Sequence, residues 1–208
     1  MKTALLTILR NKNTPQNQFR NASDKLSELL AAEAAKHIEM EPCCVETPIA
    51  HTQGCKPKHA IVLIPILRAG IAMLPAFMRI FDESRVGFFG IRRDEQTALP
   101  CLYYENIPFI GLNDQIIILD PMLATGGSAL VVIEKLIGKG IKPHLITLVS
   151  IIAAPEGMAR VKKSFPETDI LVAAQDEKLN DQKFIVPGLG DYGDRYFGIH
   201  AEALTTTV

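Results

Sequence analysis

Apolar residues recur at intervals of three and four between positions 18 and 38, which is the spacing of one face of an amphipathic helix. The residues of this face are Phe19, Ala22, Leu26, Leu29, Leu30 and Ile38. Proline and glycine then become frequent between Pro42 and Pro57, which predicts an irregular or short-stranded stretch. The pattern thus predicts an N-terminal helical segment over 18–38, before the rhythm changes.

From Ala60 onward, short apolar runs alternate with helix-like segments. Four runs have the length and continuous apolarity of buried strands, namely AIVLIPIL (60–67), QIIILD (115–120), HLITLVSII (144–152) and DILVAA (169–174). Helices are predicted after the first three, at 71–81 with a bend near Pro75, at 128–140 with glycine stops, and from Pro155 onward. Buried strands separated by helices predict an α/β fold: a mostly parallel twisted sheet with helices on both faces, as one domain over 1–208.

Two segments depart from this alternation. Residues 85–107 have strand-like ends around a charged middle, which predicts an antiparallel flap inserted between sheet strands. Residues 176–198 are rich in glycine and are predicted to form a shaped loop.

Composition and charge narrow the class of protein. Hydrophobic residues make up 48% of the 208 positions and charged residues 22%, which are ordinary globular values. The formal net charge of −1 gives no electrostatic reason to expect a nucleic acid or an anionic membrane as partner. No apolar run approaches the roughly 20 residues of a membrane span, and residues 1–20 lack a signal-peptide core. We therefore expect a cytoplasmic protein.

The four cysteines indicate neither a metal site nor a disulfide framework. Cys43 and Cys44 are adjacent, which is poor geometry for pairing with each other, and Cys55 and Cys101 complete no metal-ligand spacing. Reduced, structural thiols are predicted.

Unusual residues follow the predicted strands where each strand ends. Arg68 follows the first strand, Asp120 ends the second, the segment 153–157 follows the third, and Gln175-Asp176 follows the fourth. Ligands of open α/β sheets bind outside the carboxyl ends of the parallel strands. The four ends together predict a single crevice.

The segment 120–128 has the form of a phosphate-binding loop. Thr125, Gly126, Gly127 and Ser128 can present several backbone N–H groups at the start of the following helix, where the helix dipole favours a phosphate. Asp120 would repel that phosphate and is better suited to sugar hydroxyls. A phosphosugar ligand is one interpretation, and a plain strand–turn–helix connection is the other.

Arginines and the glycine-rich loop extend this hypothesis. Arg68 can bind a second anion bidentately, and Arg92 or Arg93 of the flap can close over a polyphosphate. Surface salt bridges and a solvated charge run are the alternatives. The base loop, IVPGLGDYGD (185–194), exposes backbone groups that can satisfy the acceptor–donor–acceptor edge of uracil, although an irregular C-terminal loop has the same composition.

Five motifs in one order carry a resemblance. PILRAG, RRDEQT, DPMLATGGS, AAPEG and IVPGLGDYGD together resemble the uracil phosphoribosyltransferase family, of the type I phosphoribosyltransferases, from about Phe19 to Gly198. More general phosphoribosyltransferases carry two adjacent acids at the strand tip, where this chain has Asp120 and Pro121.

The resemblance implies transfer of phosphoribose from phosphoribosyl pyrophosphate (PRPP) to uracil, giving UMP and pyrophosphate. It implies Asp191 and Arg93 as catalytic residues, Asp191 being the best candidate for a base by position. The implied PRPP-binding residues are Arg68, Arg93, Asp120, Pro121, Met122, Leu123, Ala124, Thr125, Gly126, Gly127, Ser128 and Asp191. The implied uracil-binding residues are Ile185, Gly190, Asp191 and Tyr192, acting largely through the backbone.

The resemblance also implies Mg²⁺ carried mainly by PRPP oxygens and water, so no protein metal cage is expected. GTP activation, known in some relatives, and a homodimer or larger homo-oligomer are further implications. The chain departs from the family pattern at Arg92, Phe184, Tyr192 and Ala31-Ala32. These departures concern the base site and GTP activation, not the reaction class.

Three other functions are weighed against this one. A non-enzymatic regulator that binds RNA would need a basic face, which the net charge of −1 disfavours. An enzyme for a purine base would need a different base loop and a pair of acids at the strand tip. A degenerate paralogue would have lost residues such as Arg68, Asp120 and Asp191, which are intact.

Overall fold

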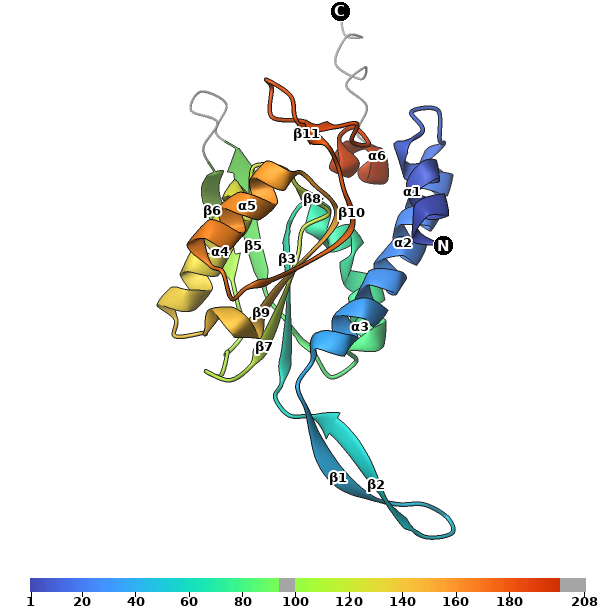
Figure 1. Cartoon of the computed structure of the whole chain (residues 1–208), viewed down its shortest axis with the longest axis vertical. Helices are drawn as coiled ribbons and strands as arrows, with labels where there is room; N and C mark the ends of the chain where they lie inside the picture. The colour runs from blue at the N-terminus through green and yellow to red at the C-terminus, as the bar shows by residue number, and fades with distance from the viewer. Residues whose placement is uncertain (94–99, 199–208) are drawn as a thin grey trace, which may run out of the picture.

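The computed structural model describes residues 1–93 and 100–198, and its centre is a mixed, largely parallel sheet (Figure 1). The strands of this sheet are β3 (Ile61–Leu67), β4 (Arg85–Val86), β5 (Phe88–Arg93), β6 (Pro100–Asn106), β7 (Gln115–Leu119), β8 (Met122–Leu123), β9 (Ile146–Ala153) and β10 (Asp169–Gln175). Their order is β10-β9-β7-β3-β5-β6, with β4 beside β3 and β8 beside β9. All neighbours are parallel except β5 and β6, which confirms the predicted fold class.

Helices cover both faces of the sheet because its central strands are apolar on both sides. On one face, α1 (Lys2–Arg10), α2 (Gln16–Ala34), α3 (Leu74–Ile80) and α6 (Tyr192–Phe197) share one apolar cluster with the sheet. On the other face, α4 (Gly127–Gly138) and α5 (Pro155–Ser164) share a second cluster. Three short 3₁₀ turns join these elements: η1 (Ala35–His37), η2 (Ala69–Ala72) and η3 (Pro143–Leu145).

Two predictions about helices need correction. No helix was predicted before residue 18, yet α1 forms there and its apolar face buries Leu5, Leu6 and Leu9. The helix predicted over 71–81 starts at Leu74 after η2, and Pro75 lies in its first turn. Proline is tolerated there because its missing N–H would have no partner within the helix, so no bend is required.

The flap is joined to the sheet more closely than predicted. In the chain it lies between the sheet strands β4 and β7, as predicted, and its first strand, β5, also pairs in parallel with β3 and antiparallel with β6, so the flap extends the sheet at one edge. The tip of the flap, 94–99, lies outside the described residues.

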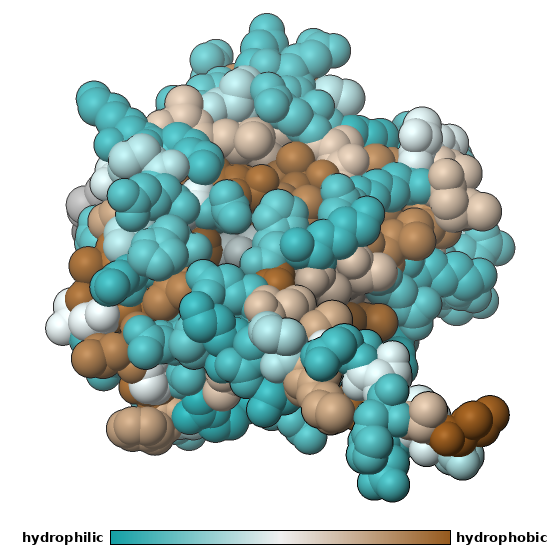
Figure 2. Space-filling model, turned by 60° about the horizontal axis from the view of Figure 1, so that its bottom comes forward, coloured by the Kyte–Doolittle hydropathy of each residue, from teal (hydrophilic) through white to brown (hydrophobic). Residues whose placement is uncertain are grey.

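The stretch 42–57 is a regular hairpin instead of an irregular segment. β1 (Met40–Glu46) and β2 (His51–Pro57) pair over seven positions and project from the body of the molecule (Figure 1). Figure 2 shows apolar colour at the end of this projection, where Ile49 is 96% exposed. Cys43, Cys44 and Cys55 on this hairpin are free thiols, as is Cys101, and all but Cys43 are exposed. They therefore do not pack in the core, contrary to the prediction of structural thiols.

The C-terminal region contains more secondary structure than a loop. β11 (Lys178–Leu179) and β12 (Ile185–Val186) form a small hairpin, and α6 follows. Across the described ranges, no helix has the length and apolarity needed to cross a bilayer.

Candidate functional site

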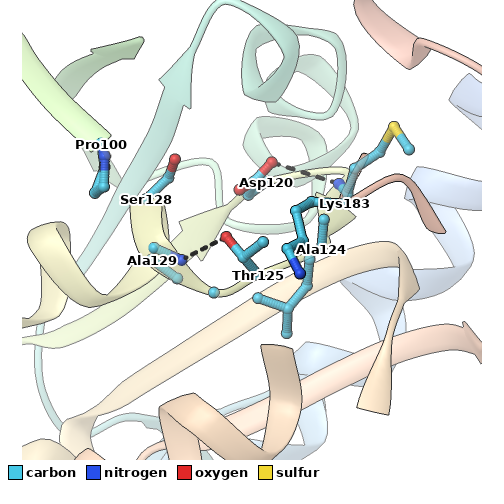
Figure 3. A pocket seen from close by; sticks show the side chains of 11 residues that line it. Pro100, Asp120, Ala124, Thr125, Ser128, Ala129 and Lys183 are labelled. Carbon is cyan, nitrogen blue, oxygen red and sulfur yellow. Dashed lines mark hydrogen bonds between the residues drawn. The ribbon is translucent and has the colours of Figure 1, made fainter. Parts of the chain in front are cut away.

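The predicted crevice exists as two adjoining cavities at the carboxyl ends of the strands. In the register, Pro65 of β3 lies opposite Leu119 of β7, so Arg68 and Asp120 emerge at the same edge. The phosphate cavity is lined by Pro100, Asp120, Met122, Leu123, Ala124, Thr125, Gly126, Gly127, Ser128, Ala129 and Lys183 (Figure 3). The arginine cavity is lined by Ile66, Leu67, Arg68, Ala69, Ile91, Arg92, Tyr103, Asp120, Met122, Ser128, Asp191, Tyr192 and Gly193. Asp120, Met122 and Ser128 line both.

The phosphate loop is held against strand β9. The carbonyl of Pro121 accepts from the N–H groups of Ile151 and Ile152 at 3.0 and 3.1 Å, so Pro121 anchors the loop and does not line the cavity. α4 then begins at Gly127. The first N–H groups of a helix have no partner within it, and they carry the positive end of the helix dipole. The loop therefore offers N–H donors to its cavity, although that of Gly127 already donates to Thr125 Oγ1 over a long 3.4 Å.

Two glycines explain why the loop motif and AAPEG occur together. Gly126 has φ +74°, a left-handed conformation that favours glycine, and a Cβ there would lie 2.9 Å from the carbonyl oxygen of Gly157. A Cβ on Gly157 would lie 2.3 Å from the carbonyl oxygen of Ala124. α5 thus packs directly on the phosphate loop, and Gly157 permits that approach. Gly157 was not among the predicted site residues.

Asp120 is the acid that the two cavities share. Its side chain is half-buried at the strand end, and the loss of hydration raises its pKa to about 6, while the backbone N–H of Met122 lowers it. That N–H donates to Asp120 Oδ1 over a long 3.4 Å. Since a half-buried carboxylate needs hydrogen-bond donors, Asp120 is suited to accept from the hydroxyls of a ligand.

The arginine cavity brings together residues far apart in the sequence. Arg68 lies just beyond β3, Arg92 lies on β5, and Asp191 comes from the base loop. Asp191 Oδ1 accepts from the backbone N–H of Asp194 at 2.9 Å and so caps α6. The side chain of Arg93, the other candidate catalytic residue, lies outside the described residues.

The predicted base-binding residues are divided among different surroundings. Ile185 is buried in the core, and Gly190 faces a third cavity with Arg10 and Phe19, so neither lines the two cavities above. The Tyr192 ring is buried against Phe19, at 5.5 Å between ring centroids, and its hydroxyl pairs with Ser23. Burial is the main reason that the pKa of Tyr192 lies well above its usual value. Because this ring belongs to the core, Tyr192 can offer a base only its backbone.

Distant residues hold the base loop in place. The Asp176 carboxylate, predicted to lie in the crevice, instead pairs with Arg10 at 2.9 Å and accepts from the N–H of Gly188 at 2.8 Å. Arg10 also donates to the carbonyl of Gly188 at 2.8 Å. From the other side, Arg195 donates to the carbonyls of Leu189 and Asn11 at 2.6 and 2.7 Å.

Several residues on the cavity walls were missed. Pro100 and Tyr103 come from β6, and the sequence indicated only that they belong to the flap. Lys183 had no signal, because the turn that brings it to the phosphate cavity was not predicted. Asp120, Met122 to Ser128, Arg68, Arg92, Asp191 and Tyr192 all lie at the crevice.

A strand-end crevice with a phosphate loop, on a parallel sheet with a flap, is the architecture of a type I phosphoribosyltransferase. The fold alone is shared with a hypoxanthine phosphoribosyltransferase from Staphylococcus aureus, at 12% identity and a TM-score of 0.50 over 82% of this chain and 85% of that one. The AQ2163 protein from Aquifex aeolicus is much more similar, at 36% identity and a TM-score of 0.86 over 96% and 95% of the two chains.

Sequence comparison gives the family. The family described as uracil phosphoribosyltransferase matches residues 2–199. The uracil phosphoribosyltransferase of Mycoplasma genitalium is 49% identical over 193 residues, which are 93% of each chain. The chain belongs to the uracil phosphoribosyltransferase family.

Proposed function

We propose that this chain transfers phosphoribose from PRPP to uracil, giving UMP and pyrophosphate. Members of its family are named for this reaction. The single observation that carries the assignment to this site is the position of Asp120, which separates a loop of N–H donors from a cavity that contains Arg68. These three parts of the site are suited to a phosphate, a sugar and a second anion, and PRPP carries these groups in that order.

In this proposal the residues from Asp120 to Ser128 bind the ribose 5-phosphate. The N–H groups at the start of α4 hold the phosphate, and Asp120 accepts hydrogen bonds from the ribose hydroxyls. Pro121 acts as an anchor, since its carbonyl is used by β9.

Pyrophosphate is bound in the arginine cavity. As the bond from the anomeric carbon to pyrophosphate breaks, positive charge develops on the sugar ring and negative charge on pyrophosphate. Arg68 and Arg93 stabilise the departing anion electrostatically. Arg92 lines the same cavity and is a further candidate for this role.

Magnesium is part of the proposal as a cofactor carried by PRPP. Among residues 1–93 and 100–198, no three His, Cys, Asp or Glu side chains gather as a metal cage, and Mg²⁺ bound mainly by phosphate oxygens and water requires none. Asp120 is the carboxylate placed to contribute, and the bound ion would neutralise charge on pyrophosphate.

Uracil is expected beside Asp191, between the arginine cavity and the base loop. Backbone groups of Gly190 to Tyr192, with Ile185, provide recognition in this proposal, and a site matched to one hydrogen-bond pattern rejects the others. Asp191 Oδ1 is occupied as the cap of α6, so Oδ2 is the oxygen available to approach the base.

One assay tests the reaction and its specificity. Purified protein is mixed with PRPP, Mg²⁺ and radiolabelled uracil, cytosine or hypoxanthine, and UMP is expected from uracil alone. No product from any base would contradict the enzymatic function. Product from hypoxanthine would contradict the substrate.

Assembly, regulation and location complete the proposal. The projecting hairpin exposes Ile49, Val45 and Met40, which supports a homodimer or larger homo-oligomer. Light scattering of the purified protein measures its mass, and addition of GTP to the assay tests activation. A cytoplasmic location is proposed with them.

A further inference from the structure

The turn between β11 and β12 holds one lysine in an unusual backbone conformation. Lys183 has φ 67°, the one non-glycine residue with a positive φ among residues 1–93 and 100–198. Such a conformation is unfavourable for a residue with a side chain, because its Cβ approaches the neighbouring backbone.

Three hydrogen bonds fix this turn. The N–H of Lys183 donates to the carbonyl of Asn180 at 2.9 Å, and the N–H of Phe184 donates to Asn180 Oδ1 at 2.8 Å. The N–H of Asn180 donates to the carbonyl of Phe184 at 2.9 Å. The turn is therefore well defined, and the direction of the Lys183 side chain follows from it.

That side chain lines the phosphate cavity. Lys183 lies across this cavity from Pro100, on the side of Asp120, Ala124 and Thr125 (Figure 3). Among the described residues that line the cavity it is the only cation, and Asp120 is the only acid. The loop itself offers N–H donors but no positive side chain to a phosphate dianion.

We propose that Lys183 binds the 5-phosphate of the substrate and of the product, and so supplies from a distant turn the cation that the phosphate loop lacks. The inference rests on the proposed function for the identity of the ligands. It assigns Lys183 as a substrate-binding residue for the phosphate, distinct from the arginines that face pyrophosphate.

Glu156 is a competing partner for Lys183. Glu156, at the start of α5, has a pKa held below its usual value, first by the N–H of Leu179, then by its own N–H, and to a smaller extent by Lys183. No ion pair within 4.0 Å joins Lys183 to Glu156 in the part of the chain that the structure describes. The ammonium group therefore remains able to meet a ligand.

Lys183→Gly is the informative variant, because glycine suits the positive φ and removes only the side chain. We expect its affinity for ribose 5-phosphate and UMP, measured by calorimetry, to fall about tenfold, as for the loss of one charge-assisted hydrogen bond at a partly solvated site. Affinity for pyrophosphate should stay within about twofold, and Lys183→Arg should bind ribose 5-phosphate nearly as the wild type does. Lys178→Ala, an exposed lysine on the same hairpin, is the matched control and should change neither affinity.

These measurements test the role of Lys183 separately from the proposed formation of UMP. If the wild type forms no UMP but Lys183→Gly still weakens ribose 5-phosphate binding, the reaction is wrong and the phosphate contact stands. Unchanged ribose 5-phosphate affinity, loss of pyrophosphate affinity instead, or a wild type that binds neither ribose 5-phosphate nor UMP would each overturn the role of Lys183. A lowered melting temperature shared by Lys183→Gly and Glu156→Gln, with unchanged ligand affinities, would reassign Lys183 to an ion pair.

Discussion

The two ends of the crevice are built by different means. The phosphate end is built mainly from consecutive residues, 119–129, in which a strand, a loop and a helix follow one another, with Gly157 packed behind and with Pro100 and Lys183 added from other segments. The base end, 185–193, is held by Arg10 from the first helix, by Asp176, and by Arg195 beyond it. The first end is therefore mostly local in sequence, whereas the second is held by a residue 178 positions away, as the hydrogen bond from Arg10 to the carbonyl of Gly188 shows.

This difference predicts different responses to mutation. In the proposed function, ligand groups contact the loop of the phosphate end directly, so a substitution there should affect PRPP and leave uracil recognition intact. At the base end, the loop keeps its shape through α1, so a substitution far from the ligand should affect uracil. Separate KM values for the two substrates distinguish the ends.

The largest effect is expected from Asp120→Ala. Loss of the carboxylate removes charged hydrogen bonds to the ribose, and kcat/KM for PRPP should fall about a hundredfold. The protein should remain folded, because the main hydrogen bond that Asp120 makes in the described chain is the long one to Met122. Steady-state kinetics and circular dichroism check both statements, and Asp181→Asn on an exposed turn is the control. Full activity in Asp120→Ala would show that Asp120 does not contribute to PRPP binding or to the reaction.

At the phosphate end, Gly157→Ala is expected to have a smaller effect than Asp120→Ala. The added Cβ would lie 2.3 Å from the carbonyl oxygen of Ala124, so α5 or the phosphate loop must move. We expect KM for PRPP to rise about tenfold and the free energy of unfolding to fall by about 1–3 kcal/mol. Gly138→Ala is a close control, since its Cβ would meet nothing within 4 Å. Equal behaviour of the two variants would show that the packing of α5 on the loop is unimportant.

Arg10→Ala tests the base end. It leaves the Asp176 carboxylate, whose side chain is 2% exposed, without its charged partner, and unfolding should become easier by about 2–4 kcal/mol. KM for uracil should rise about fivefold as the loop loosens, a change near 1 kcal/mol, while KM for PRPP stays within about twofold. Arg79→Ala breaks an exposed pair with Glu28 and should change little. A rise confined to PRPP would contradict the division between the ends.

The same division explains what could be predicted from the sequence. The strands β3, β7, β9 and β10 and the loop 120–128 are patterns of neighbouring residues, and each was placed within a few positions. Parallel register then brought Arg68 and Asp120 to one edge, as the rule for strand ends requires.

The features that escaped prediction are set by contacts between distant segments. Asp176 was expected in the crevice, yet its carboxylate binds Arg10, and nothing near either residue in the sequence indicates this pair. The ring of Tyr192 fills the core beside Phe19 and Ser23 of α2, which no local pattern indicated, while its backbone role toward uracil stays a prediction. Lys183 reaches the phosphate cavity only because Asn180 fixes the turn.

The smallest expected effect concerns the pH dependence of stability and returns to Asp120. Its pKa is raised in the folded protein, to about 6 from 3.8, so the charged form is the one that folding disfavours. Stability should therefore be lost as the pH rises from about 4 to above 6, the interval between the unfolded and folded values. Asp120→Asn removes this dependence. Without ligand, it should unfold like the wild type near pH 4 and be more stable at pH 7.5, by on the order of 1 kcal/mol after allowance for the partial exposure of Asp120. Urea denaturation of both proteins across this range measures the difference. If the difference in unfolding free energy between the two proteins did not change with pH, folding would not disfavour the charged form of Asp120. A carboxylate that is already well solvated would gain less by accepting hydrogen bonds from ribose hydroxyls.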